Sequence, residues 1–230
     1  MTAVLGFDTA TPATVAGVLR EDGVVLEARH DPEPGERPGH ATRLLGLVDE
    51  VLSAAGIELG DVERIAVGVG PGSFTGLRIG IATARGLAQG TGAELAPVST
   101  LRALAANALP AEHPVVAAVD ARRGEVFAAA WIGDTEVMAP AALAPEELAR
   151  RLRDLASAPT PSPLALGDGA LRFRHDLEPA GARIPPDGDP LHRVSARHVC
   201  RLGAGAQPAG IDAVAPDYLR PPDAEVRRTP

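Results

Sequence analysis

The chain has no lysine: the 22 basic residues among its 230 are all arginine. This excludes a lysine Schiff base, a kinase-type lysine and a Walker A phosphate loop. A single cysteine, Cys200, excludes an intrachain disulfide and a cysteine-based metal cluster, and it indicates a reducing, cytoplasmic setting. No apolar run approaches the roughly 18 residues of a membrane span. The start, Met1–Asp8, lacks the basic region of a signal peptide, so we expect no membrane contact.

Positive charge and aromatic side chains are also scarce. The formal net charge is −8 and aromatic residues make up 3% of the chain. Autonomous nucleic-acid binding is therefore disfavoured, because it usually needs a basic surface and stacking side chains. The 45% apolar content indicates a globular protein, and the length allows one large domain or two small lobes.

Residues 68–88 predict the end of a strand, a glycine-rich turn and a helix. The run 64–68 is short and apolar, residues 70–72 (Gly-Pro-Gly) break regular structure, and Ser73 or Thr75 can cap the helix. The spacing G-x-G-x-x-x-G is one residue too long for a dinucleotide-binding turn, and Ser73 is not in a G-x-S-x-G elbow. A nucleotide site or a hydrolase nucleophile in this turn has little support.

The helix predicted over 73–90 is apolar or small around most of its circumference. One arc can cover a sheet: Leu77, Ile81, Ala84 and Ala88. A second series has a small residue at every fourth position: Gly76, Gly80, Ala84 and Ala88. Each interior glycine costs about 0.8–1 kcal/mol of helix stability, so we expect another helix backbone to approach closely. A second protein chain is the favoured source of that helix, because one lobe has few layers to cover so wide an arc; burial within its own domain is the alternative.

A second helix, predicted over 40–55, has an apolar arc of about 160°, which is wider than one sheet requires. His40 at its start is interpreted as a cap or interface residue, not as a metal ligand. Together the two helices form a predicted partner interface. It consists of His40, Leu44, Leu45, Val48, Val51, Leu52, Gly76, Leu77, Gly80, Ile81, Ala84, Arg85 and Ala88.

The string G-V-G-P-G-S-F-T-G-L-R-I-G at 68–80 closely resembles the signature of the bacterial TsaB family, a subunit of the machinery that makes threonylcarbamoyladenosine in tRNA. The run 120–127 is similar to the family's D-A-R-x-x-E-V-Y, with Phe127 in place of tyrosine, and the run 164–170 is similar to its V-G-x-G-A. The ending at 216–221 matches P-x-Y-L-R. The resemblance therefore runs the length of the chain.

This resemblance implies an α/β fold of the actin/hexokinase-like (ribonuclease H-like) class, with two lobes and a reduced second lobe. We expect lobes at 1–104 and 105–214, and a tail at 215–230 that returns to the first lobe with Tyr218 packed there. The pattern predicts strands at 4–8, 14–20, 24–30, 64–68, 93–98, 115–120, 124–132 and 164–166 and helices at 40–55, 73–90, 99–109, 145–157 and 195–202.

The catalytic paralogue, TsaD, binds a metal through two histidines that follow the strand predicted at 93–98. Thr100 and Leu104 stand at those positions here, so the resemblance implies no metal site and no catalytic residue in this chain. The implied function is a non-catalytic subunit that binds and stabilises a TsaD-type transferase, which modifies adenosine 37 of tRNA. ATP and metal are then expected on partner subunits, a TsaE-type ATPase is a further partner, the chain alone forms a homodimer, and tRNA is reached only through the complex.

Three acidic or hydroxyl residues lie where this fold class keeps its phosphate loops. Asp8 and Thr9 match the first loop and Asp120 the second, so each is a candidate for a residual nucleotide contact; for Asp8 a turn-forming role is the alternative. For Asp120 or Glu125 we favour a salt bridge with a neighbouring arginine, Arg122 or Arg123, over a catalytic role. A small-molecule kinase would need Asp8 and Asp120 to hold Mg²⁺, and a peptidase would need a metal pair or an activated nucleophile.

Overall fold

A computed structural model describes residues 3–33, 35–156 and 161–220. The chain divides into two compact units, one of residues 1–103 and 194–217, the other of residues 104–193 and 218–230. The predicted second lobe, 105–214, therefore differs from the structure, because residues 194–214 belong to the first unit.

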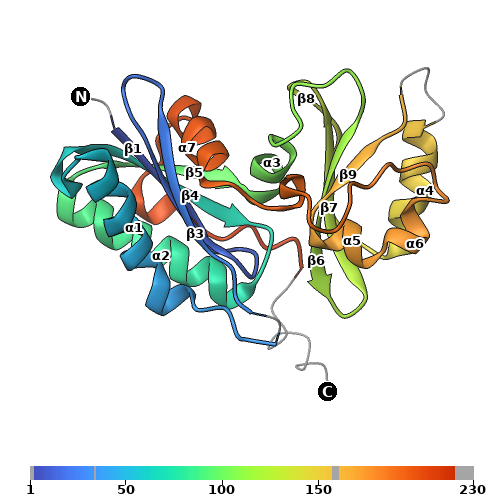
Figure 1. Cartoon of the computed structure of the whole chain (residues 1–230), viewed down its shortest axis with the longest axis horizontal. Helices are drawn as coiled ribbons and strands as arrows, with labels where there is room; N and C mark the ends of the chain where they lie inside the picture. The colour runs from blue at the N-terminus through green and yellow to red at the C-terminus, as the bar shows by residue number, and fades with distance from the viewer. Residues whose placement is uncertain (1–2, 34, 157–160, 221–230) are drawn as a thin grey trace. The chain divides into compact units, whose positions relative to one another are not determined.

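The first unit is built on a five-stranded sheet of order β3-β2-β1-β4-β5 (Figure 1). Its strands are β1 (Ala3–Asp8), β2 (Thr14–Leu19), β3 (Val25–His30), β4 (Val62–Gly70) and β5 (Glu94–Ser99). The first three form the predicted antiparallel meander, and Gly23 adopts the positive φ of +82° that the β2–β3 turn requires. β4 and β5 run parallel to β1, so each needs a helical crossover.

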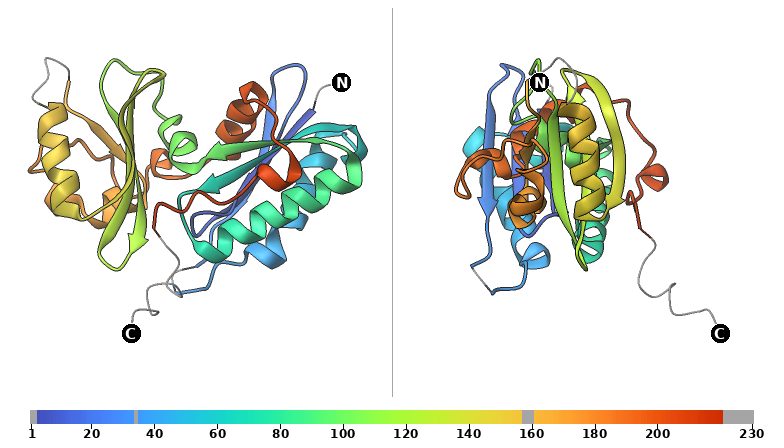
Figure 2. Two further views of the ribbon diagram at one scale, coloured as in Figure 1. Left: turned by 180° about the vertical axis from the view of Figure 1, so that it is seen from behind. Right: turned by 90° about the vertical axis from the view of Figure 1, so that its right-hand side faces the viewer.

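Two crossover helices, α1 (His40–Ala55) and α2 (Phe74–Thr91), cover one face of this sheet, and α7 (Ala196–Gly205) covers the other (Figure 2). The Ser73 hydroxyl caps α2 by accepting from the Gly76 N–H at 3.3 Å, as predicted. Buried side chains from the sheet and both crossover helices form one core. The short helices η1 (Leu59–Asp61) and η3 (Ile211–Ala213) complete the unit.

Arg64 explains why α7 belongs to the first unit. Its guanidinium donates from β4 to the carbonyl oxygens of Gly203, Ala204 and Ala206 at 3.2, 2.8 and 3.1 Å, which satisfies acceptors left open at the helix end. The Ser195 hydroxyl caps the other end of α7, as predicted. Long-range contacts of this kind leave no periodic signal in the sequence, so the prediction placed the helix in the wrong lobe.

The chain after α7 returns along the first unit as far as Asp217. Arg85 donates to the Val214 carbonyl oxygen at 2.8 Å, and the Asp217 N–H donates to the Val69 carbonyl oxygen at 2.8 Å. Tyr218 and Arg220 belong to the second unit, where Arg220 binds Glu125 at 2.6 Å. The assignment of Tyr218 differs from the expectation that it packs on the first lobe, and the part of the tail at 221–230 lies outside the described residues.

The second unit has a four-stranded sheet of order β8-β7-β6-β9. Its strands are β6 (Val115–Arg122), β7 (Glu125–Ile132), β8 (Thr135–Leu143) and β9 (Leu164–Leu166). Its helices are α4 (Pro145–Ala156), α5 (Asp168–Arg172), α6 (Arg174–Leu177) and η2 (Pro190–His192), and α3 (Thr100–Ala105) spans the division between the units. β8 was not predicted, because Pro140 and several alanines hide a strand pattern that is also irregular in register. Among the described residues, no helix combines the length and apolar content that crossing a bilayer requires.

The glycine series of α2 packs inside the first unit, which contradicts the expected contact with a second chain. A Cβ at Gly76 would overlap the Thr9 carbonyl oxygen, and a Cβ at Gly80 would lie 2.5 Å from the Thr9 hydroxyl oxygen. The backbone that approaches α2 closely is therefore that of the β1–β2 turn. Glycine has no side chain whose hydrophobicity could reveal the direction it faces.

We expect Gly76→Ala to lower the free energy of unfolding by about 1–3 kcal/mol or more, because the new methyl group meets a backbone oxygen that cannot rotate away. Gly86→Ala on the same helix is the matched control. A Cβ there meets nothing within 4 Å, so the change should stabilise by about 0.5–1 kcal/mol. Thermal melting measures both; equal effects of the two variants would contradict this packing.

Candidate functional site

The Asp8 carboxylate is enclosed at the end of β1 and is 1% exposed. One oxygen accepts from the Ala10 N–H at 2.7 Å and the other from the Thr100 hydroxyl at 2.7 Å. A Cβ at Gly68 would overlap the carboxylate, so only glycine fits beside it on β4. Burial raises the pKa of Asp8 above its usual 3.8, and the two hydrogen bonds oppose this only in part. Both oxygens are thus committed to the protein itself.

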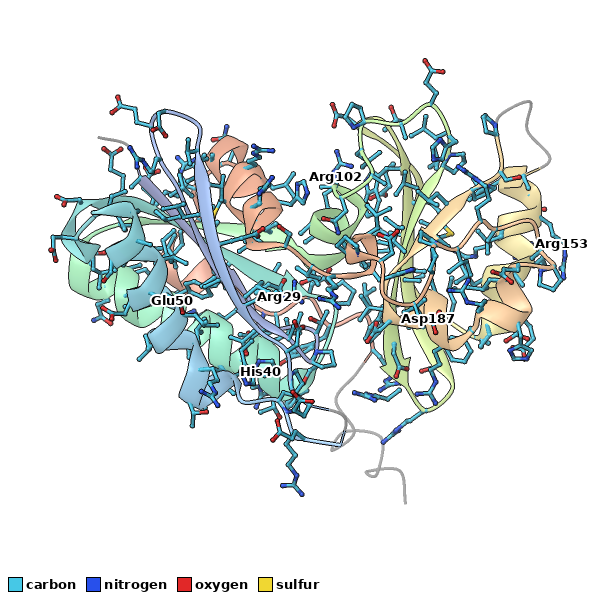
Figure 3. All side chains as sticks on the ribbon, viewed as in Figure 1. Arg29, His40, Glu50, Arg102, Arg153 and Asp187 are labelled. Carbon is cyan, nitrogen blue, oxygen red and sulfur yellow. The ribbon has the colours of Figure 1, made fainter. Side chains whose placement is uncertain are left out.

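Thr9 and His40 join the same buried region to the crossover helices. The Thr9 hydroxyl donates to the Gly76 carbonyl oxygen at 2.7 Å, and the Thr14 hydroxyl lies 2.8 Å from Nδ1 of His40 at the start of α1 (Figure 3). Burial, and then the nearby His30, lowers the pKa of His40, so its ring is neutral near neutral pH. His40 is 3% exposed and forms no side-chain cap, which contradicts both roles predicted for it.

Thr100 and Leu104, the positions at which the sequence resemblance implies that metal ligands have been lost, have ordinary structural roles. The Thr100 hydroxyl is used by Asp8, and the Leu104 side chain is 1% exposed in an apolar environment. Within the described ranges, no three histidine, cysteine, aspartate or glutamate side chains gather in a way that could hold a metal ion. An aliphatic side chain supplies no donor atom at all.

In the second unit, Asp120 holds two arginines. Its Oδ2 accepts from the Arg172 guanidinium at 2.9 Å and lies 3.4 Å from that of Arg122, so the predicted salt bridge with Arg122 is confirmed. The Asp120 N–H donates to Asp168 at 3.0 Å. Burial, and to a lesser extent the Asp120 charge, raises the pKa of Asp168. Arg172 and Asp168 were not predicted, since nothing in the sequence links them to residue 120.

The turn that resembles an adenosine-binding turn packs directly on β6. A Cβ at Gly167 would overlap the Ala118 carbonyl oxygen, and one at Gly169 would lie 2.7 Å from Val126 Cγ2. The Gly167 N–H donates to His192 Nδ1 at 3.0 Å. The backbone of this turn is therefore used for packing inside its own unit.

The predicted partner interface lies mostly in the core. All its members except Leu45 and Arg85 are buried within the first unit, because the helix arcs are covered by the sheet, by each other and by the β1–β2 turn. Arg85 is partly buried and binds the returning tail. Its Nε atom is enclosed and has no hydrogen-bond partner among the described residues.

Besides the charged residues Arg43, Asp49, Glu50 and Arg78, the outward side of α1 and α2 carries a set of uncharged residues. We call it the outer face, and it consists of Leu45, Gly46, Thr75, Ala82, Gly86 and Gly90. Leu45 is 58% exposed, more than any other large hydrophobic residue in the described ranges. A Cβ at Gly46, Gly86 or Gly90 would meet no atom within 4 Å, so this face is open.

Comparisons with known proteins agree on one family. Residues 32–172 match the family model "TsaD: tRNA N6-adenosine threonylcarbamoyltransferase". The chain is 33% identical to the tRNA threonylcarbamoyladenosine biosynthesis protein TsaB of Escherichia coli, over 94% of each chain. It is 27% identical to the protein of that name from Bacillus subtilis, over 97% of this chain and 96% of the relative.

Solved structures confirm the predicted fold class. YeaZ from Pseudomonas aeruginosa superimposes with a TM-score of 0.78 and 30% identity, covering 95% of this chain and all of that one (100%). The ROK hexokinase from Thermus thermophilus superimposes with a TM-score of 0.52 over 88% of this chain and 99% of that one. At 15% identity, the hexokinase shows only that the fold is shared.

We expect the free energy of unfolding of the Asp8→Asn variant, compared with that of the wild type, to increase as the pH rises. The folded chain keeps the Asp8 proton to higher pH than the unfolded chain, so the stability that Asp8 contributes falls as pH rises from about 3.8 through the higher folded pKa. Asparagine has no charge to lose and can still bond the Ala10 N–H and the Thr100 hydroxyl.

Melting curves between about pH 4 and about pH 7 measure this difference in stability. Each unit by which the folded pKa of Asp8 exceeds the unfolded pKa changes the free energy of unfolding by about 1.4 kcal/mol. A change of about 1 kcal/mol shifts Tm by roughly 2–4 °C in a chain of this size. Asp49→Asn makes the same change on the exposed surface of α1 and is the matched control. A Tm difference between Asp8→Asn and wild type that is constant over this range would contradict the expectation.

Proposed function

The chain belongs to the TsaB family of tRNA threonylcarbamoyladenosine biosynthesis proteins, and we propose that it acts there as a non-catalytic subunit that binds and stabilises a TsaD-type threonylcarbamoyltransferase. The observation that carries the proposal is the outer face. Leu45 projects from α1, and the exposed positions of α2 at 75, 82, 86 and 90 carry no charge. An exposed leucine on α1 and open glycines on α1 and α2 suit the close approach of a partner helix.

The state of the polar residues supports a non-catalytic role. Asp8 has both oxygens bound inside its unit, and Asp120 is paired with two arginines, so neither has the free carboxylate that a kinase would need for Mg²⁺. Cys200 is buried, and burial raises the pKa of its thiol to about 12, which removes it as a nucleophile for a peptidase. The chemistry would then belong to the partner.

The other parts of the proposal follow from assigning the chemistry to the partner subunits. ATP and the metal ion would be bound by the partner subunits, and a TsaE-type ATPase would join the complex. tRNA binding would require that complex, since the chain alone has a net charge of −8. Without a partner, two copies of the chain would pair through the outer face, because a two-fold dimer is the simplest way to cover it.

Leu45→Glu should weaken binding of the TsaD-type partner at least tenfold, about 1.4 kcal/mol, because a carboxylate would be buried in the contact. Folding should be unaffected, because Leu45 is exposed. Val137→Glu on β8 is the matched control, since it changes another exposed aliphatic residue, 37% exposed, in the second unit. Co-purification and titration calorimetry measure affinity; unchanged binding by Leu45→Glu would exclude this face.

The purified chain alone should transfer no threonylcarbamoyl group to tRNA, and adding the TsaD-type partner should be required for any transfer. Incorporation of labelled threonine into tRNA measures this. Turnover by the chain without partners, lost in Asp8→Ala, would show that the subunit is an enzyme.

A further inference from the structure

The turn between β6 and β7 has an unfavourable backbone conformation for its sequence. Arg122 and Arg123 have φ angles of +64° and +54°, and Gly124 follows at +80°. Every other described residue with such a positive φ is a glycine. A left-handed backbone is strained for a residue with a Cβ, and Asn-Gly is the sequence that this kind of two-residue hairpin favours. Arginine at these positions lowers stability instead of raising it.

A hydrogen bond offsets part of this strain, because Asp120 Oδ1 accepts from the Arg122 N–H at 2.9 Å. Both side chains are exposed, and that of Arg122 is 69% exposed, so no apolar burial is gained. The ion pair between Arg122 and Asp120 at 3.4 Å is of the exposed kind that contributes little. Residues held in a disfavoured backbone conformation cluster at sites that contact another molecule.

The charges of this region are arranged so that the positive groups face outward. Asp120 has a side chain that is 8% exposed, and it orients the guanidinium groups of Arg122 and Arg172 from the inside. Asp168 bonds the Asp120 N–H, and Glu125, opposite Arg122 in the hairpin, is paired with Arg220. The surface therefore presents three exposed arginines, two of them held by the partly buried Asp120, in a chain whose net charge is −8. We call Arg122, Arg123 and Arg172 the arginine turn; the first two lie in the hairpin between β6 and β7 and the third in α5, elements that Figure 1 labels.

We propose that the arginine turn contacts the phosphodiester backbone of RNA once the chain is assembled with its catalytic partner. Guanidinium forks match phosphate oxygens in geometry and charge, and such contacts position RNA without reading its sequence. Aromatic side chains, which would stack on bases, are scarce in the chain, so a backbone contact is the form that fits. The choice of RNA over an acidic protein rests on the proposed function, which supplies a tRNA substrate.

The test uses the complex of this chain with the TsaD-type partner and a fluorescein-labelled, unmodified tRNA transcript, with binding followed by anisotropy over a range of salt concentrations. Arg122→Asn/Arg123→Asn removes two charges and creates the favoured Asn-Gly turn. We expect melting at or above the wild-type temperature, tRNA affinity about tenfold lower, and a slope of log K against log salt reduced by about 0.7–0.9 per lost contact. Arg172→Gln, which leaves the turn backbone unchanged, should weaken binding in the same direction.

The matched control is Arg150→Gln/Arg153→Gln on α4, which removes two exposed charges from the same unit; Figure 3 labels Arg153. Its tRNA affinity should equal that of the wild type. Wild-type binding by the turn variants, or equal weakening by the control, overturns the proposal. Loss of partner affinity in place of tRNA affinity would show that the turn contacts protein. Failure of the wild-type complex to assemble would count against the proposed function, whereas a complex that assembles and binds tRNA equally well with and without the turn arginines would count against the turn alone.

Discussion

The close contact between the β1–β2 turn and helix α2 is the constraint on which the first unit depends. Thr9 lies against the helix backbone at Gly76 and Gly80, and its hydroxyl bonds the Gly76 carbonyl oxygen. Ala10 accepts from the Ser73 N–H, at the cap of the same helix, and Asp8 ties the end of β1 to Thr100. The unusual glycine content of α2 therefore allows β1, β4 and the helix to approach more closely than side chains would permit.

This contact also determines which surfaces remain for function. Because the polar groups of the first loop are bonded to each other and to α2, that loop is committed to holding the unit together. What α1 and α2 leave in solvent includes the charged residues Arg43, Asp49, Glu50 and Arg78 as well as the outer face, which is uncharged and rich in small residues. The chain matches the family model of a transferase, yet its Thr100 hydroxyl is used for a hydrogen bond to Asp8 inside the first unit.

In the second unit, arginine side chains pair with a carboxylate. The partly buried Asp120 pairs with the exposed Arg122 and Arg172, so that negative charge fixes positive charge in position, and Asp168 bonds the Asp120 N–H. In the first unit, Arg64 and Arg85 serve the backbone instead, by bonding carbonyl oxygens of segments far along the chain. A basic complement made only of arginine suits both uses, since a guanidinium can bond several acceptors at once.

Periodicity and capping signals by themselves determined most strands, the two long helices, the caps at Ser73 and Ser195 and the pairing of Asp120 with Arg122, because each depends on residues close in sequence. The string at 68–80 also identified the family. Only the tertiary structure decided which side of α2 is internal, because small residues recur on both sides and a glycine gives no hydrophobic signal. It likewise decided that α7 joins the first unit, since the carbonyl contacts of Arg64 span well over a hundred residues of chain and depend on where the folded backbone ends.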